Sequence, residues 1–190
     1  MAYNICKDLL SNIGVQCGDQ VAAGFTGRAL LAPKASSNFT KDTNGDILTW
    51  SSDDMVLVDN VWANAMDGTQ ANLVTDNGRP AYHHDLGVRV PRTDAVKTRN
   101  TVKALATQSL CGIFEREDGT YLAVGFYGKM IATAQTQAEN ASAGDWVNTL
   151  GVDESMPEVL LVDTPAVGST PAVTAKSKFD ALWDAIVVAA

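Results

Sequence analysis

The stretch LCGIFEREDGTYLAVGFYGKMIAT, Leu110–Thr133, is the best-defined piece of the chain. Two runs rich in apolar residues, Leu110–Phe114 and Tyr121–Tyr127, flank the charged segment Glu115–Gly119. An Asp-Gly pair between such runs predicts a β-hairpin, because glycine accepts the positive φ of a tight turn. From Tyr121 to Met130 two sets of residues alternate, and this alternation predicts a strand with one packed face and one contact face.

The length and composition indicate one domain, with an added terminal element as the alternative. The chain has 190 residues, of which 46% are hydrophobic and only 19% are charged. A low charge content fits a surface partly covered by other chains, and it fits equally a neutral globule. The net charge of −8 argues against a general nucleic-acid binder, which needs Lys and Arg to displace counterions from phosphates.

The three cysteines, Cys6, Cys17 and Cys111, are expected to be free thiols in a reducing compartment. Their number is odd, and no Cys or His lies at metal-ligand spacing. The opening MAYNICKDLL lacks the basic and apolar regions of a signal peptide. No apolar run approaches the ~20 residues of a membrane span. We therefore expect a cytoplasmic origin and no membrane partner.

Three segments are expected along the chain. Residues 1–20 form an N-terminal helical arm, with Ile5, Leu9, Leu10 and Ile13 at helical spacing. This arm packs on the body or docks on a neighbouring subunit. Residues 21–163 form the core, and residues 164–190 form a linker and a C-terminal helix capped by Thr174. The apolar stripe of this helix, Phe179, Leu182, Trp183 and Ile186, folds back on the same subunit or docks on another.

The core is predicted to be mainly β (α+β), an antiparallel β-sandwich or barrel with one central flanking helix. The predicted strands beside the hairpin are Gly24–Pro33, Ile47–Trp50, Met55–Val61, Ala81–Pro91 and Glu158–Val162, with Trp146–Leu150 either a short strand or irregular. The helix is predicted over Thr93–Ser109, and its basic side chains face solvent or an acidic patch on an adjacent subunit. Ala63–Pro80 is predicted to be an exposed loop, and Gln135–Gly144 a polar turn.

No stretch carries a recognisable catalytic, cofactor or metal motif. His83, His84 and Asp85 suggest such chemistry, but neighbours on a strand point to opposite faces. Asp42, Asn44 and Asp46 predict a hairpin turn, because the glycine and glutamate of a calcium loop are missing at the required spacing. We therefore expect no catalytic residue, no cofactor, no metal and no enzymatic activity.

The order of elements resembles the major tail (tail-tube) proteins of long-tailed bacteriophages. The resemblance spans roughly Gly24–Val162: strands with a long loop, one central helix at Thr93–Ser109, and then the hairpin LCGIFEREDGTYLAVGFYGK. The opening MAYNICKDLLSNIGVQCGD also resembles the start of phage structural proteins associated with Bacteroides-type hosts.

The resemblance implies a β-sandwich subunit, of which six copies close a ring with a continuous inner β-barrel. Rings would stack into a tail tube in the virion, assembled in the bacterial host cytoplasm with other virion proteins. DNA would pass through an acidic lumen without specific binding. The resemblance further implies a homo-oligomeric interface at Tyr121, Ala123, Gly125, Tyr127 and Lys129, and ring-to-ring contacts at Met66, Asp67, Asn72, Asp76 and Asn77 within the loop Ser51–Pro80.

Two alternatives stay open at this point. The first is a capsid decoration protein or head–tail connector that uses the terminal helices as docking arms. The second is a small ligand-binding or enzymatic β-domain built on His83, His84 and Asp85.

Overall fold

The computed structural model describes residues 25–58, 72–76, 79–90, 95–138, 145–156, 158–167 and 170–189. The elements are β1 (Phe25–Pro33), the 3₁₀ turn η1 (Lys34–Ser36), β2 (Ser37–Lys41), β3 (Ile47–Ser52), β4 (Val56–Val58), β5 (Asn72–Asp76), β6 (Arg79–Val90), α2 (Ala95–Thr107), β7 (Leu110–Arg116), β8 (Tyr121–Val124), β9 (Ile131–Ala138), β10 (Asp145–Glu154) and α3 (Ala175–Ala189). The mainly-β class predicted from the sequence is confirmed.

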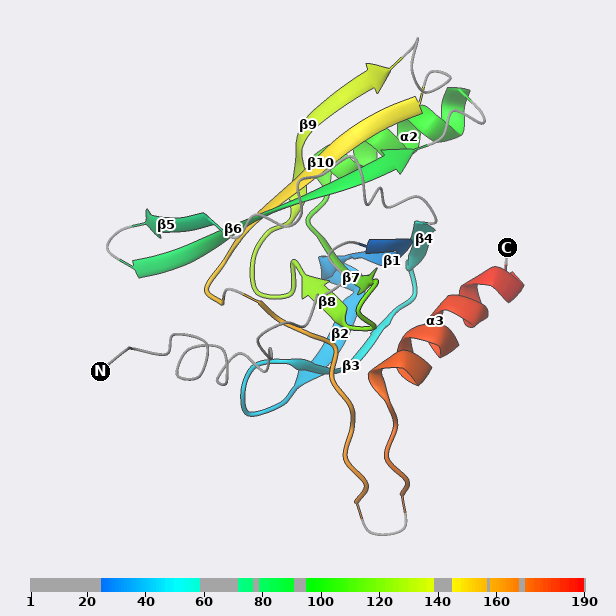
Figure 1. Cartoon of the computed structure of the whole chain (residues 1–190). Coiled ribbons are helices and arrows are strands. Elements are labelled where there is room, and N and C mark those ends of the chain that lie inside the picture. Colours follow the sequence, from blue (N-terminus) through cyan, green and yellow to red (C-terminus); the bar gives the residue numbers. More distant parts are fainter. Residues whose placement is uncertain are drawn as a thin grey trace.

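The strands form three sheets with antiparallel pairing throughout (Figure 1). The central sheet has the order β4-β1-β7-β8, the outer sheet β5-β6-β10-β9, and the small sheet pairs β2 with β3. The sheets do not close into a barrel within the described residues. The predicted hairpin is confirmed as β7–β8, with Gly119 at φ +81° in its turn.

Both faces of the central sheet are buried. One face packs on the outer sheet and α2, around Leu31, Phe114 and Leu150. The other packs on the small sheet, the segment 158–162 and α3, around Leu30, Ile113 and Phe179. The predicted contact face on the second hairpin strand is therefore wrong. A strand buried on both faces reads as a continuous apolar run, and LCGIF and YLAV are such runs.

The outer sheet holds two differences from the sequence prediction. Asn72–Asp76, predicted to lie in a loop, forms β5 and pairs with the first residues of β6, from Asp76 opposite Arg79 to Asn72 opposite His83. The predicted polar turn at Gln135–Gly144 begins inside β9, which pairs along β10. Both strands lie at an edge of the sheet, and β9 contains only one large apolar residue, Ile131.

The turn between β2 and β3 is built by one carboxylate. Oδ1 of Asp42 accepts hydrogen bonds from the backbone amides of Asn44, Gly45 and Asp46, at 2.8, 2.8 and 2.9 Å. Gly45 has φ +97°. The predicted hairpin turn at this position is confirmed.

Helix α3 folds back on its own subunit. The hydroxyl of Thr174 accepts from the amide of Ser177 and caps the first turn, as predicted. Phe179 is fully buried in the core, which contributes on the order of 2–3 kcal/mol. Nζ of Lys178 donates to the carbonyls of Leu48 and Val162, at 2.7 and 2.6 Å. The predicted N-terminal arm lies outside the described residues.

Segment 158–162 meets its neighbours through single bridges, Leu122 with Leu160 and Ile47 with Leu161, rather than as a full strand. In the described part of the chain, no helix is both long and apolar enough to cross a membrane.

Candidate assembly surface

Strand β9 forms one edge of the outer sheet and lacks the charged and proline residues that commonly protect an edge. Its eight residues, IATAQTQA, include neither a charged side chain nor a proline. β10 is its partner on one side, and among the described residues no strand pairs with the other side. Folded proteins usually cover such an edge or mark it with Lys or Pro, because its free N–H and C=O groups can pair with another chain.

A second open stretch lies on the opposite side of the same sheet. β5 covers β6 only from Arg79 to His83, whereas β10 pairs with β6 from Tyr82 to Val90. In the described parts of the chain, no strand flanks residues 84–90 of β6 on the β5 side. The outer sheet can therefore be extended at two different edges.

The amide side chains of Gln135 and Asn148 hold β9 against α2 and β10. Nε2 of Gln135 donates to the carbonyl of Val102 at 2.7 Å and to Oδ1 of Asn148 at 2.9 Å. Nδ2 of Asn148, which is fully buried, donates to the carbonyls of Val88 and Trp146. This network fixes the position of the open edge.

Helix α2 runs along the inner face of the outer sheet and bears only basic charge. Its sequence AVKTRNTVKALAT contains no acidic residue. A cavity of about 520 Å³ separates the helix from β9 and β10, and its lining includes Arg99, Lys103, Gln137 and Trp146. Arg99 and Lys103 are exposed, so the groove beside the β9 edge is cationic in a chain of net charge −8.

Among the described side chains, the other face of the outer sheet carries small residues on β9 and a charged cluster at His83. Thr133, Ala134 and Thr136 of β9 are exposed. At the far end His83 lies between two carboxylates, with Nδ1 2.7 Å from Oδ1 of Asp153 and Nε2 3.2 Å from Oδ1 of Asp85. Pairing with Asp153 in particular raises the pKa of His83 above its ordinary value.

His83, His84 and Asp85 do not form one site. His84 points to the inner face, is buried, and brings Nε2 within 3.5 Å of the carbonyl of Met156. His83 and Asp85 lie on the outer face, as the strand periodicity predicted. No group of three metal-ligating side chains occurs within the described residues.

A buried carboxylate lies near His84. Glu154 is only 3% exposed, and Oε1 accepts from the amide of Gly125 at 2.8 Å. Burial raises the pKa of Glu154, and the amides of Gly125, Tyr127 and Gly128, together with His84, oppose this shift. The carboxylate anchors the turn that follows β8.

The interface residues predicted on the hairpin are mostly inside the subunit. Tyr121 and Ala123 are 3% and 1% exposed, and Gly125 is also buried. These three cannot present a contact surface, which corrects the prediction for them. Tyr127 is half-buried, donating its hydroxyl to the carbonyl of Gly45, and Lys129 is exposed.

Two of the five residues predicted to contact the next ring lie in the described part of the chain. Asn72 and Asp76 are the end residues of β5. Met66, Asp67 and Asn77 lie outside the described residues. The β5–β6 hairpin projects from the body (Figure 1), as a contact element would.

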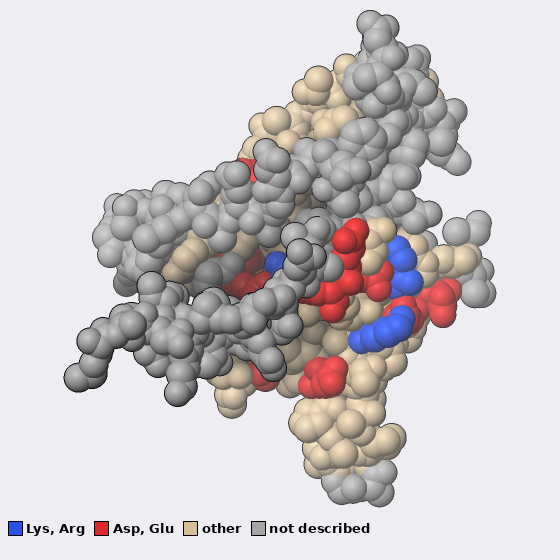
Figure 2. All heavy atoms as spheres, in the orientation of Figure 1, with Lys and Arg blue, Asp and Glu red and all other residues tan. Residues whose placement is uncertain are grey.

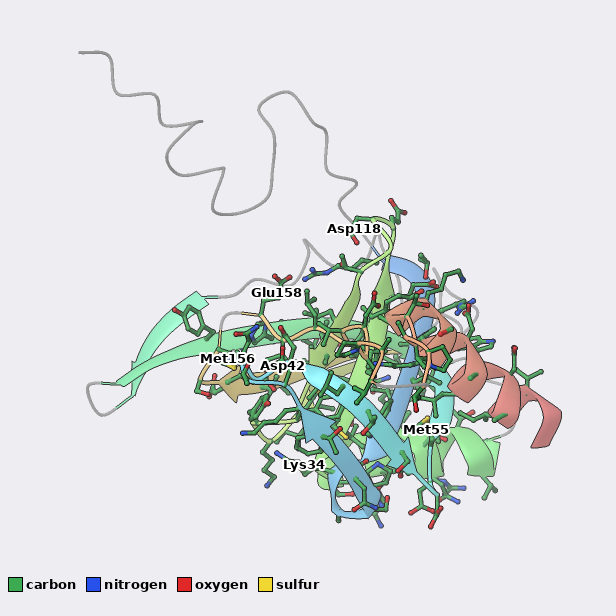
Figure 3. The ribbon with its side chains drawn as sticks, turned by 90° about the horizontal axis from the view of Figure 1, so that it is seen from below. Lys34, Asp42, Met55, Asp118, Met156 and Glu158 are labelled. Atoms are coloured by element: carbon green, nitrogen blue, oxygen red, sulfur yellow. The ribbon has the colours of Figure 1, made fainter. Side chains whose placement is uncertain are left out.

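Several acidic side chains gather on one face of the molecule. Figure 2 shows them gathered near the middle of that face, with few basic side chains beside them. Asp118 lies at the outer end of the β7–β8 hairpin and points away from the body (Figure 3). Arg28 and Arg116 partly neutralise this region through Glu115 and Glu158.

Sequence reasoning missed the open edge at β9. The run IATAQTQA carries little strand signal, because Ala alternates with polar residues only as far as Gln135 and the run has little hydrophobicity. No protein-family model matches the chain, and no curated protein or solved structure matches it either.

Proposed function

We propose that the chain is a self-assembling virion structural subunit that forms the tail tube of a long-tailed phage. The observation that carries this proposal is the unprotected edge of β9, eight residues without charge or proline. Such an edge is a hazard in a monomer and an advantage in an assembly, because a neighbour pairs its backbone groups.

The two open stretches belong to different strands, which favours a head-to-tail contact. β6 and β9 are both antiparallel to β10, so they run in the same direction. A second copy that continues the sheet places residues 84–90 of its β6 parallel to β9 of the first. Contacts between two different surfaces close into a ring or continue as a filament, depending on the rotation between copies.

We place the exposed face of the outer sheet toward the channel of such a ring. Thr133, Ala134 and Thr136 offer DNA no cationic group, and Asp85 and Asp153 add carboxylates that repel phosphate. Helix α2 covers the opposite face, so Arg99 and Lys103 lie away from the channel. DNA then slides without being bound.

We assign the contact between rings to the β5–β6 hairpin. The last pair between β10 and β6 joins Glu154 to Tyr82. Residues 79–81 of β6 lie beyond this pair and are held by β5 alone. This projecting arm reaches beyond the sheet that builds the ring. In this proposal the protein acts by shape and contact rather than by catalysis, in the virion tail after assembly in the host cytoplasm.

Negative-stain electron microscopy of the purified protein at increasing concentration tests this function. The expected result is stacked rings or tubes with a central channel. Single closed rings at every concentration support a head–tail connector in place of a tube. A protein that stays monomeric with and without phage tail-initiation components contradicts the proposal.

A further inference from the structure

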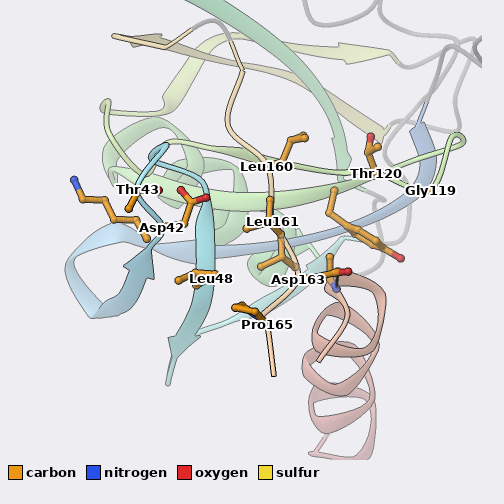
Figure 4. A pocket seen from close by; sticks show the side chains of 13 residues that line it. Asp42, Thr43, Leu48, Gly119, Thr120, Leu160, Leu161, Asp163 and Pro165 are labelled. Carbon is orange, nitrogen blue, oxygen red and sulfur yellow. Dashed lines mark hydrogen bonds between the residues drawn. The ribbon is translucent and has the colours of Figure 1, made fainter. Parts of the chain in front are cut away.

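A second cavity lies far from the β9 edge, on the side of the hairpin tip. Its volume is about 940 Å³, and its lining includes Leu48, Gly119, Thr120, Leu160, Val162 and Pro165 (Figure 4). These residues come from β3, the β7–β8 turn and the segment that leads to α3. We call this cavity the tip groove.

The floor of the tip groove is apolar and its polar rim is already engaged. Leu48, Leu160 and Val162 are only half-buried. Asp42 at the rim binds the amides of its own turn, and Oδ1 of Asp163 accepts from the amide of Ala175 at 2.6 Å. The groove therefore favours apolar side chains over a charged small ligand.

The chain enters the described structure beside this groove. Phe25, the first described residue, pairs with Arg116. The amide of Arg116 donates to the carbonyl of Thr120, which lines the groove. Residues 1–24 are thus tethered at the hairpin that borders the tip groove. An extended chain spans roughly 3.3 Å per residue, so the tether is long enough to reach the floor.

The N-terminal segment carries an apolar stripe that needs a partner. Ile5, Leu9, Leu10 and Ile13 share one side of the predicted helix. The corresponding stripes of α2 and α3 are already packed into the two cores described above. An amphipathic helix commonly binds by laying such anchors into an apolar groove.

We propose that the N-terminal segment, residues 1–24, binds in the tip groove of its own subunit. The inference stands apart from the proposed function, because it concerns one subunit and needs neither a ring nor a tube. It covers the exposed parts of the half-buried side chains of Leu48, Leu160 and Val162.

Crosslinking in the full-length protein tests this placement. Cys6 lies next to the stripe, and Val162→Cys places a second thiol at the groove floor. A short bismaleimide should link the two within one chain, as read by peptide mapping of the monomer band. The matched control is Val96→Cys on α2, where Val96 is 55% exposed and no described residue of the helix lines the tip groove. We expect at least tenfold faster linkage to V162C than to V96C.

A second variant tests whether the apolar stripe directs the binding. Leu9→Asp with Leu10→Asp, added to V162C, should slow the linkage about tenfold, because the charged side chains resist burial. Circular dichroism and the thermal midpoint verify that each variant is folded. Equal rates for V162C and V96C, no effect of the aspartates, or links only between two subunits would overturn the proposal.

Discussion

Arg28 and Asp180 tie the first strand of the central sheet to the C-terminal helix, with Nη2 2.6 Å from Oδ1. The guanidinium also lies 5.0 Å from the ring of Phe179 and 4.8 Å from that of Trp183. Its Nε lies 3.1 Å from Oε2 of Glu115. One side chain from β1 therefore fixes both the position and the orientation of α3.

Arg28→Ala is expected to lower the free energy of unfolding by roughly 1–3 kcal/mol. The variant loses partly exposed ion pairs with Asp180 and Glu115 and the cation–π contacts with two rings, each worth about 1 kcal/mol or less, together with packing of the side-chain stem. Urea unfolding measures the change. Lys176→Ala removes the exposed i,i+4 pair with Asp180 and should cost under about 0.5 kcal/mol. Equal losses in the two variants would contradict this role of Arg28.

Gly125→Ala is expected to destabilise the protein by at least about 2 kcal/mol. Gly125 has φ +85°, and an added Cβ would lie 2.4 Å from the carbonyl oxygen of Leu110. Gly119→Ala is the matched control, since Gly119 has φ +81° and nothing lies within 4 Å of its Cβ position. That variant should cost only the backbone term of about 1 kcal/mol. Thermal and urea unfolding measure both variants. The loss in Gly119→Ala gives the cost of the positive φ alone, and the additional loss in Gly125→Ala gives the cost of steric overlap.

His83 should make a pH-dependent contribution to stability. Its pKa is raised above the ordinary 6.5, mainly by its hydrogen bond to Asp153. A raised pKa means that the folded state binds the proton more tightly, so the gain is complete below about 6.5 and disappears as pH rises through the folded pKa. The stability difference between wild type and His83→Gln should be a few tenths to about 1 kcal/mol larger at pH 5.5 than at pH 8.5. A stability difference that does not change with pH would show that the charge on His83 does not stabilise the fold.

Glu154 should also make a contribution to stability that falls as pH rises, but here burial is the cause of the raised pKa. Burial raises its pKa above the ordinary 4.5, so its contribution is greatest below that value and is lost as pH rises through the folded pKa. Glu154→Gln retains an acceptor for the amide of Gly125 but does not titrate. Urea unfolding between pH 4.5 and 7.5 should therefore show the variant gaining on wild type as pH rises. A stability difference between the two proteins that stays constant with pH would contradict a raised pKa for Glu154.

The sequence predicted the elements that carry a strong local signal. The hairpin with Gly119 follows from an Asp-Gly pair between two apolar runs, and the strand through Leu86 and Val88 and the helix containing Phe179 follow from local periodicity. The burial of Tyr121 and Ala123 did not follow, because alternation in one strand does not reveal how many layers pack around it.

The assembly surface was less predictable for a related reason. An edge strand in an open sheet lacks the apolar signal that identifies strands, so Gln135–Ala138 was predicted as part of a polar turn. The placement of Asn148 and Gln135, which position that edge, depends on contacts with α2 that local sequence does not encode. His83 and Asp85 could be assigned to one face from periodicity, whereas Asp153 joins them only through the pairing of β10 with β6.

The central claim is that copies join through β9. Sedimentation velocity should compare the wild type with Ala134→Lys combined with Thr136→Lys, which places two exposed lysines on the open edge. The matched control, Ala181→Lys with Ala185→Lys, adds the same charge at exposed positions of α3. We predict that wild type and control form rings or larger assemblies, whereas the β9 variant sediments as a folded monomer. Assembly of the β9 variant to the same extent as the control would contradict the account.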